Sequence, residues 1–149
     1  MNIQKRKVDF LMEQYINAAV EQFRTLLNEQ IARERRMEQD KKVTDYSKLD
    51  KIIIGICGGD GIGPIISAES ERLLQFILKD EIAAGKIELR TIEGLTIENR
   101  IAHNKAIPDD VLAEIKACNV ILKAPTTTLK GGTLESANVA MRRELDLYA

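Results

Sequence analysis

The most chemically suggestive residues lie near the end of the sequence, where a serine, an asparagine and an arginine share a predicted helix. Ser136 stands at the predicted start of that helix, where its hydroxyl and the first free amides offer a site for an anion. Asn138 and Arg142 are four residues apart, so they project from one helical face. Because an arginine holds a carboxylate through two hydrogen bonds, this trio suits a carboxylate-rich ligand. The pattern also fits an ordinary capped helix whose arginine pairs with Glu or Asp.

A second group of polar residues surrounds the end of a short apolar run, residues 120–125. Lys123 lies inside this run, where a lysine either extends its ammonium group to solvent or meets an anion. The loop that follows, residues 126–132, carries three threonines, among them Thr127 and Thr128, together with one lysine and two glycines. Open α/β sheets bind ligands just past the carboxyl ends of their strands. We therefore expect these hydroxyl and cationic groups to lie at a small-molecule site.

A cluster of glycines marks a third place of interest. Five of the nine glycines fall between residues 55 and 63, and residues 58–64 read Gly-Gly-Asp-Gly-Ile-Gly-Pro. No Lys-Ser or Lys-Thr pair closes the cluster, so it is not a P-loop, and Pro64 stands where the dinucleotide fingerprint needs its third glycine. The spacing predicts a tight turn that brings the backbone close to another group. A purely structural turn accounts for it equally well.

The elements that position these residues alternate between strands and helices, which is typical of an α/β fold. An uninterrupted apolar run such as residues 52–57 is typical of a strand that is buried on both faces. Strands are expected at residues 52–57, 86–93 and 120–122, and helices from Pro64 to Gly85, from Pro108 onward and over 136–147.

The first 42 residues contain neither glycine nor proline and carry apolar side chains at helical spacing. This stripe comprises Val8, Met12, Ile16, Val20, Phe23, Leu27 and Ile31. We predict an N-terminal amphipathic helix with a linker over residues 1–46 and a separate domain over residues 47–149. Because such a helix must bury its apolar face, we expect it to pack on its own domain or to self-associate. Recruitment of a different partner is the alternative.

The composition argues against several classes of function. With 22 basic and 23 acidic residues, the net charge is -1, which gives no electrostatic reason to expect nucleic acid or an acidic membrane surface. No stretch approaches the run of about 18 apolar residues that spans a bilayer. Cys57 and Cys118 are too few for a disulfide scaffold, so we expect a cytoplasmic protein. His103 stands alone, and we identify no complete catalytic set and no metal site.

In this order, the segments resemble the isocitrate/isopropylmalate dehydrogenase family, the metal-dependent β-decarboxylating dehydrogenases. The resemblance covers about residues 50–149 and favours the isocitrate branch. Its motifs are residues 59–64, the pair Ile107-Pro108 with residues 120–128, and residues 136–149. One departure is Ile65, which stands where the family usually carries glutamate.

The resemblance assigns roles to the polar residues singled out above. It implies that Ser136, Asn138 and Arg142 bind the carboxylates of isocitrate, with Lys123 nearby. It also implies that Thr127 and Thr128 lie beside the substrate and the nicotinamide part of the cofactor. The family uses NAD or NADP together with Mg²⁺ or Mn²⁺. We assign none of these cofactors to the chain by itself.

The family resemblance also implies that much of the enzyme is missing. Family members are more than twice as long, and we expect a truncated chain without the metal-binding aspartates, the proton-transferring tyrosine and lysine, or the adenosine-binding loop. Oxidative decarboxylation depends on such groups. We therefore expect a catalytically incomplete binding, regulatory or assembly protein, a pseudoenzyme that retains part of an isocitrate or citrate site. We expect it to form a homo-oligomer through the N-terminal helix.

Two alternatives remain open at this point. The chain can be the N-terminal half of a split NAD(P)-dependent isocitrate dehydrogenase that is active only with a second polypeptide. It can also be the product of a broken gene.

Overall fold

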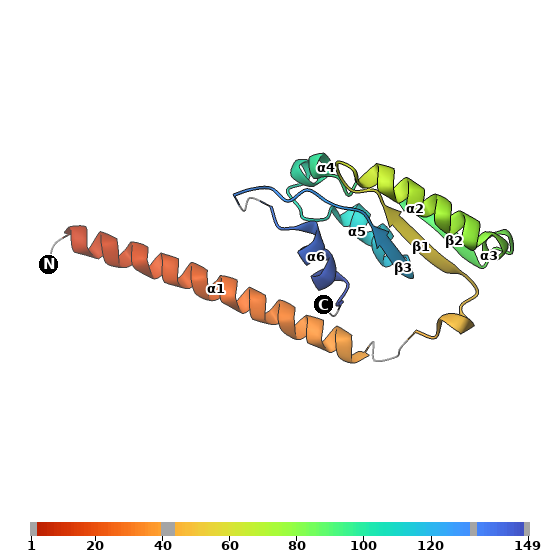
Figure 1. Ribbon diagram of the computed structural model, residues 1–149. Helices are drawn as coiled ribbons and strands as arrows, with labels where there is room; N and C mark the ends of the chain where they lie inside the picture. Colours follow the sequence, from red (N-terminus) through yellow and green to blue (C-terminus); the bar gives the residue numbers. More distant parts are fainter. Residues whose placement is uncertain (1–2, 40–43, 132–133, 148–149) are drawn as a thin grey trace. The chain divides into compact units, whose positions relative to one another are not determined.

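The computed structural model describes residues 3–39, 44–131 and 134–147, and the chain divides into two compact units, Met1–Thr44 and Asp45–Ala149 (Figure 1). The first unit is one long helix, α1, Ile3–Gln39, as the absence of helix breakers predicts. Its described side chains begin at Phe10, so Val8 of the predicted stripe lies outside them. The large apolar side chains of α1 are exposed: Phe10, Leu11, Met12, Tyr15, Ile16, Val20, Phe23, Leu26, Leu27, Ile31 and Met37.

The second unit opens with one turn of 3₁₀ helix, η1, Tyr46–Lys48, at the boundary expected between the linker and the second domain. The Asp45 carboxylate accepts a hydrogen bond from the backbone N–H of Ser47 (3.2 Å). The Tyr46 hydroxyl donates to the carbonyl oxygen of Asn119 (3.4 Å). The second contact attaches the short helix to the rest of the second unit.

Three parallel strands form the sheet of the second unit, in the order β2-β1-β3 (Figure 1). The strands are β1 (Ile52–Cys57), β2 (Ile87–Ile92) and β3 (Val120–Lys123), so all three predicted strands are present, with ends shifted by at most one residue. β1 lies in the middle, with Ile54 opposite Leu89 on one side and Val120 on the other. The predicted α/β class is therefore confirmed.

Helices connect the strands and follow the last one, and four of them differ from the expectation. One predicted helix up to Gly85 is divided at Leu78 into α2 (Gly63–Ile77) and α3 (Lys79–Ala83). The helix α4 (Ile97–Ala102) was not predicted, and α5 (Asp109–Lys116) starts directly after Pro108 as expected. The last helix, α6 (Ala137–Glu144), is shorter than predicted and is followed by Asp146 in the left-handed region at φ 51°.

The hydrophobic core places α6 against the sheet. Successive residues of a strand face opposite sides, and Cys57 of β1 faces the core formed with α5 and α6. Burial raises the pKa of the Cys57 thiol to about 11, as expected of a core cysteine rather than a nucleophile. The buried core residues are Cys57, Ile92, Leu95, Ile107, Val111, Ile115, Ala137, Ala140 and Met141. The helix with the predicted carboxylate-binding residues is thus packed into the core.

Candidate functional site

The glycine-rich turn after β1 packs against the loop that follows β3. Gly59 has φ 67°, and a Cβ atom added there would lie 2.1 Å from the carbonyl oxygen of Pro125. The backbone N–H of Asp60 donates to the same oxygen (2.8 Å). The close backbone approach that the glycine spacing predicts is therefore made to the protein's own chain.

The carboxylate of Asp60 joins three loops at the carboxyl ends of the strands. Its Oδ1 accepts a hydrogen bond from the backbone N–H of Ile97 (2.7 Å), at the start of α4. Its Oδ2 accepts one from the backbone N–H of Thr127 (2.6 Å), in the loop after β3. Hydrogen bonds to an ionised carboxylate are short and strong. Asp60 therefore fixes Thr127 relative to the turn after β1.

The guanidinium group of Arg100, in α4, holds the same loop at two points and is fully buried. Nε donates to the carbonyl oxygen of Ala106 (2.8 Å), Nη1 to that of Thr127 (2.7 Å) and Nη2 to that of Glu135 (2.9 Å). The sequence pattern does not reveal this residue, because a single arginine in a polar segment is typical of an exposed helix. No local signal in the sequence distinguishes it.

The ammonium group of Lys123 lies at the base of this loop. It is partly buried and donates to the carbonyl oxygen of Ala124 (2.6 Å) and to the Thr126 hydroxyl (3.4 Å). Burial is the main cause that lowers the pKa of Lys123; the thiol of Cys57 opposes this effect, and the charge of Arg100 adds to it. A carboxylate bound beside Lys123 would raise its pKa.

Thr127 and Thr128 are both exposed on this loop. Because Asp60 engages the N–H of Thr127 and Arg100 engages its carbonyl oxygen, Thr127 offers its side chain to a ligand rather than its backbone. The predicted role of the two threonines beside the nicotinamide stays a prediction.

Helix α6 presents Asn138 and Arg142 on an exposed face, as their spacing predicts. Ala137, Ala140 and Met141 occupy the buried face. Ser136 takes the N-cap position at the predicted start of the helix, but its hydroxyl makes no capping hydrogen bond, unlike in the alternative of an ordinary capped helix. The extended backbone of Ser136 leads directly into α6, and the helix start is held by its packing into the core.

The two neighbouring arginines of α6 differ in their partners. Arg143 forms ion pairs with Glu135 (2.8 Å) and Glu144 (3.3 Å). Within the described residues, Arg142 forms no ion pair and is exposed. The ordinary structural role that the sequence left open, pairing with an acidic side chain, therefore belongs to Arg143 and not to Arg142.

The structure brings some of the predicted residues together and leaves others apart. The Arg100 guanidinium binds the carbonyl oxygens of both Thr127 and Glu135. Thr127 and Ser136 therefore lie at or next to the two residues that Arg100 holds. Lys123 reaches Thr126 of the same loop. No hydrogen bond in the described part of the chain joins Arg142 to the loop.

The divalent metal that the family resemblance implies finds no ligand set in this part of the chain. Among residues 3–39, 44–131 and 134–147, no three His, Cys, Asp or Glu side chains gather where they could hold a metal ion. We therefore derive no step through a metal. In the same residues, no helix combines the length and the apolar character that crossing a membrane requires.

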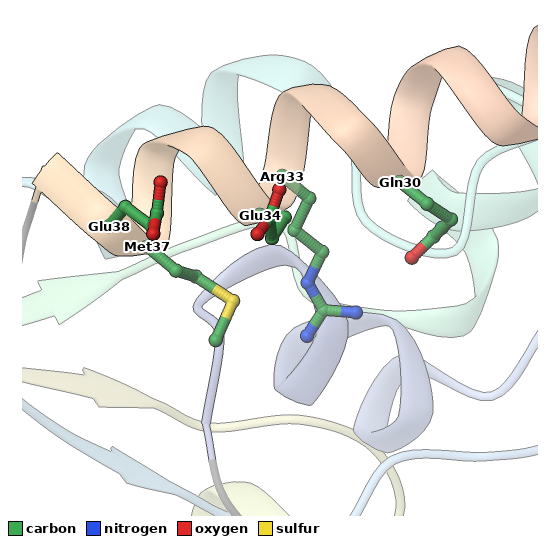
Figure 2. A pocket seen from close by; sticks show the side chains of 5 residues that line it. All are labelled: Gln30, Arg33, Glu34, Met37 and Glu38. Atoms are coloured by element: carbon green, nitrogen blue, oxygen red, sulfur yellow. The ribbon is translucent and has the colours of Figure 1, made fainter.

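A separate hollow lies near the end of α1 (Figure 2). Figure 2 shows the lining side chains of Gln30, Arg33, Glu34, Met37 and Glu38. All five belong to α1, so the hollow contains none of the residues singled out by the sequence. We assign it no ligand.

Comparison with known proteins relates most of the second unit to one enzyme family. The profile of the isocitrate/isopropylmalate dehydrogenase family matches residues 53–149. An NADP isocitrate dehydrogenase of Haloferax volcanii is 31% identical over 114 residues, which cover 74% of this chain and 26% of that protein. The corresponding protein of Archaeoglobus fulgidus is 37% identical over 103 residues, or 67% of this chain and 24% of that protein. The chain thus spans about a quarter of the length of these relatives.

A solved structure shares the fold. The crystal structure of a β-decarboxylating dehydrogenase from Thermococcus kodakarensis, in its apo form, superposes with a TM-score of 0.56 and 26% sequence identity. The match covers 65% of this chain and 27% of that one.

Proposed function

The chain belongs to the isocitrate/isopropylmalate dehydrogenase family, and on that premise we propose that it binds a tricarboxylate such as isocitrate or citrate at the carboxyl end of its sheet. In this proposal Arg142 holds one carboxylate through two hydrogen bonds, and Asn138 donates its amide from the same face. The hydroxyl of Ser136 and the first amides of α6 receive a second carboxylate. Lys123 adds positive charge, and Thr127 and Thr128 lie beside the tricarboxylate and the nicotinamide part of a bound NAD or NADP.

The observation that carries the proposal is that polar groups on one face of α6 have no ion-pair or capping partner within the described residues. Arg142 is exposed and forms no ion pair within the described residues, whereas Arg143 is paired twice. The Ser136 hydroxyl makes no capping hydrogen bond. These groups are therefore available to a ligand without breaking a contact of the protein. A ligand with several carboxylates suits them, because each group favours an anion.

We further propose that the chain alone does not catalyse oxidative decarboxylation and acts as a binding, regulatory or assembly subunit. The reaction needs a Lewis acid at the substrate carbonyl, a hydride acceptor and an acid–base pair. The residues assigned above supply substrate contacts rather than these functions. Cys57 and Cys118 are free thiols, which supports a reducing compartment such as the cytoplasm.

Calorimetric titration of the purified chain with isocitrate and with citrate tests the binding proposal. We expect a saturable heat for both ligands at one site. A parallel assay follows reduction of NAD or NADP with isocitrate and Mg²⁺ or Mn²⁺, and we expect no steady turnover. The absence of binding heat for both ligands contradicts the binding site, and steady turnover contradicts the subunit role.

A second candidate function is the N-terminal half of a split NAD(P)-dependent isocitrate dehydrogenase. It is favoured by the outer face of α2, where Ile65, Leu73 and Phe76 are 68%, 60% and 75% exposed. In the described chain β3 is an edge strand, which offers a free edge for a further strand. Exposed apolar surface of this kind is usually covered by a partner. Isocitrate-dependent turnover that appears only with a co-purifying second polypeptide distinguishes this function from the first.

We also propose that a second copy of the chain covers the apolar stripe of α1. The helix has 37 residues and a length of about 55 Å. The side chains of the stripe are 45% to 59% exposed: Met12, Ile16, Val20, Phe23, Leu27 and Ile31. Exposed apolar surface of this extent is usually covered by a partner, and a second copy brings an identical stripe.

Light scattering at micromolar concentration is expected to give at least the mass of a dimer. The double variant Ile16→Glu/Phe23→Glu places two charges in the stripe and is expected to give a monomer, because the contact would bury them. The matched control, Gln14→Glu/Thr25→Glu, adds the same charges on the opposite face and is expected to keep the oligomer. A monomeric parent chain would contradict self-association.

A further inference from the structure

We infer that Arg100 is a positioning residue that holds Thr127 and Glu135, at the two ends of the ligand-binding loop between β3 and α6, at a fixed separation. Its consequence for the binding of a tricarboxylate rests on the proposed function. The clamp itself is a property of the folded chain and can be measured without a ligand.

The geometry of Arg100 is that of a three-point clamp. Its carbonyl acceptors come from the segment between α4 and α5 (Ala106), from the start of the loop (Thr127) and from its end (Glu135). The guanidinium is planar and its donors have a fixed fork geometry, so one group defines the relative positions of all three oxygens. No other residue in the described part of the chain forms side-chain hydrogen bonds to both ends of this loop.

The cost of burying Arg100 indicates that its hydrogen bonds, rather than its volume, explain its presence. A buried guanidinium is costly, and an apolar side chain of similar length would fill the space without that cost. Three carbonyl oxygens accept its hydrogen bonds, and the carboxylate of Asp60 binds the N–H of Thr127 while Arg100 binds the carbonyl oxygen of the same residue. A carboxylate and a guanidinium of opposite charge therefore hold the Thr127 backbone from both sides.

The clamp has a direct consequence for the proposed site. The two loop carbonyls that Arg100 binds are each one residue away from a proposed ligand contact: Thr127 precedes Thr128, and Glu135 precedes Ser136. Their hydroxyls are thereby held before a ligand arrives, which reduces the entropy lost on binding. Arg100 thus favours ligands whose carboxylates match the fixed spacing, and its loss weakens the preference for citrate over a shorter dicarboxylate such as malate.

The experiment compares Arg100→Met and Arg100→Lys with Arg72→Met, a control at an exposed arginine of α2. Hydrogen exchange of the Thr127 amide reports the clamp, and amides of β1 report global stability. In Arg100→Met we expect exchange at Thr127 to rise on the order of tenfold beyond any change in β1. Citrate affinity is expected to fall on the order of tenfold, and the preference over malate to shrink. Arg100→Lys keeps the charge but loses the three-point geometry, so it is expected to resemble Arg100→Met.

A further variant tests the hydrogen bonds directly. Arg100→Ala leaves space for a free guanidinium ion, which at millimolar concentration is expected to restore Thr127 protection and citrate affinity. If Arg100→Met does not fold, Arg100→Lys and the guanidinium rescue of Arg100→Ala decide whether Arg100 positions the loop. Unchanged protection and affinity in a folded Arg100 variant would overturn the inference. If the parent chain binds neither citrate nor isocitrate, the proposed function fails, while exchange at Thr127 still decides whether the clamp exists.

Discussion

Replacing Gly59 with alanine is expected to destabilise the second unit by about 3 to 5 kcal/mol, within the range of severe backbone and packing defects. The added Cβ would lie 2.1 Å from the Pro125 carbonyl oxygen, and the residue has φ 67°. Backbone atoms cannot yield as a flexible side chain does. The loop after β3 would therefore have to move away from the turn, and Asp60 would lose its bond to Pro125.

Gly61 provides the matched control for this variant. It has φ 58°, but an added Cβ would meet nothing within 4 Å. Gly61→Ala is therefore expected to cost only the conformational strain, about 1 kcal/mol. Urea unfolding of the two variants measures the difference in the free energy of unfolding. Equal stability of the two variants would contradict the close approach of the two loops.

Arg142→Gln is expected to weaken citrate binding by about 10- to 100-fold, because it removes charge-assisted hydrogen bonds of about 1.5 to 3 kcal/mol. Its exposure and the absence of an ion pair within the described residues indicate little effect on the free energy of unfolding. Calorimetric titration measures the affinity, and urea unfolding measures the stability.

Arg143→Gln is the control, because it changes the net charge of the chain by the same amount on the same helix. It breaks the pairs of Arg143 with Glu135 and Glu144, which are partly exposed and contribute about 0 to 1 kcal/mol to stability. We expect its citrate affinity to stay within about twofold of the parent chain. Equal losses in the two variants would indicate a general effect of charge rather than a site on the face of Arg142.

The elements of the fold that the sequence predicts are those with strong local patterns. β1 is an uninterrupted apolar run, and α1 lacks glycine and proline over its whole length. The helix α4 was missed because it has only six residues and begins at a threonine cap that is no stronger than many loop sequences. The division of the predicted helix at Leu78 follows no glycine or proline, so local propensity does not reveal it.

The candidate site likewise contains some residues that the sequence places correctly and others that it does not reveal. Helical spacing alone places Asn138 and Arg142 on one face of α6, because that relation spans one turn. The clamp residues act over long distances in the sequence: Asp60 contacts Thr127, and Arg100 contacts Thr127 and Glu135. Which carbonyl or amide they meet depends on how loops from three strands converge. Such contacts have no periodic signature in a single sequence.

Amide chemical-shift mapping of the whole chain with citrate tests the central proposal most directly, because it locates the bound ligand without requiring turnover. We predict saturable shifts concentrated at Lys123, Thr127, Thr128 and residues 136–142, with α1 unaffected. Saturation should follow a single affinity that Arg142→Gln weakens. The absence of shifts at saturating citrate, or shifts confined to other parts of the chain, would contradict a tricarboxylate site at the carboxyl end of the sheet.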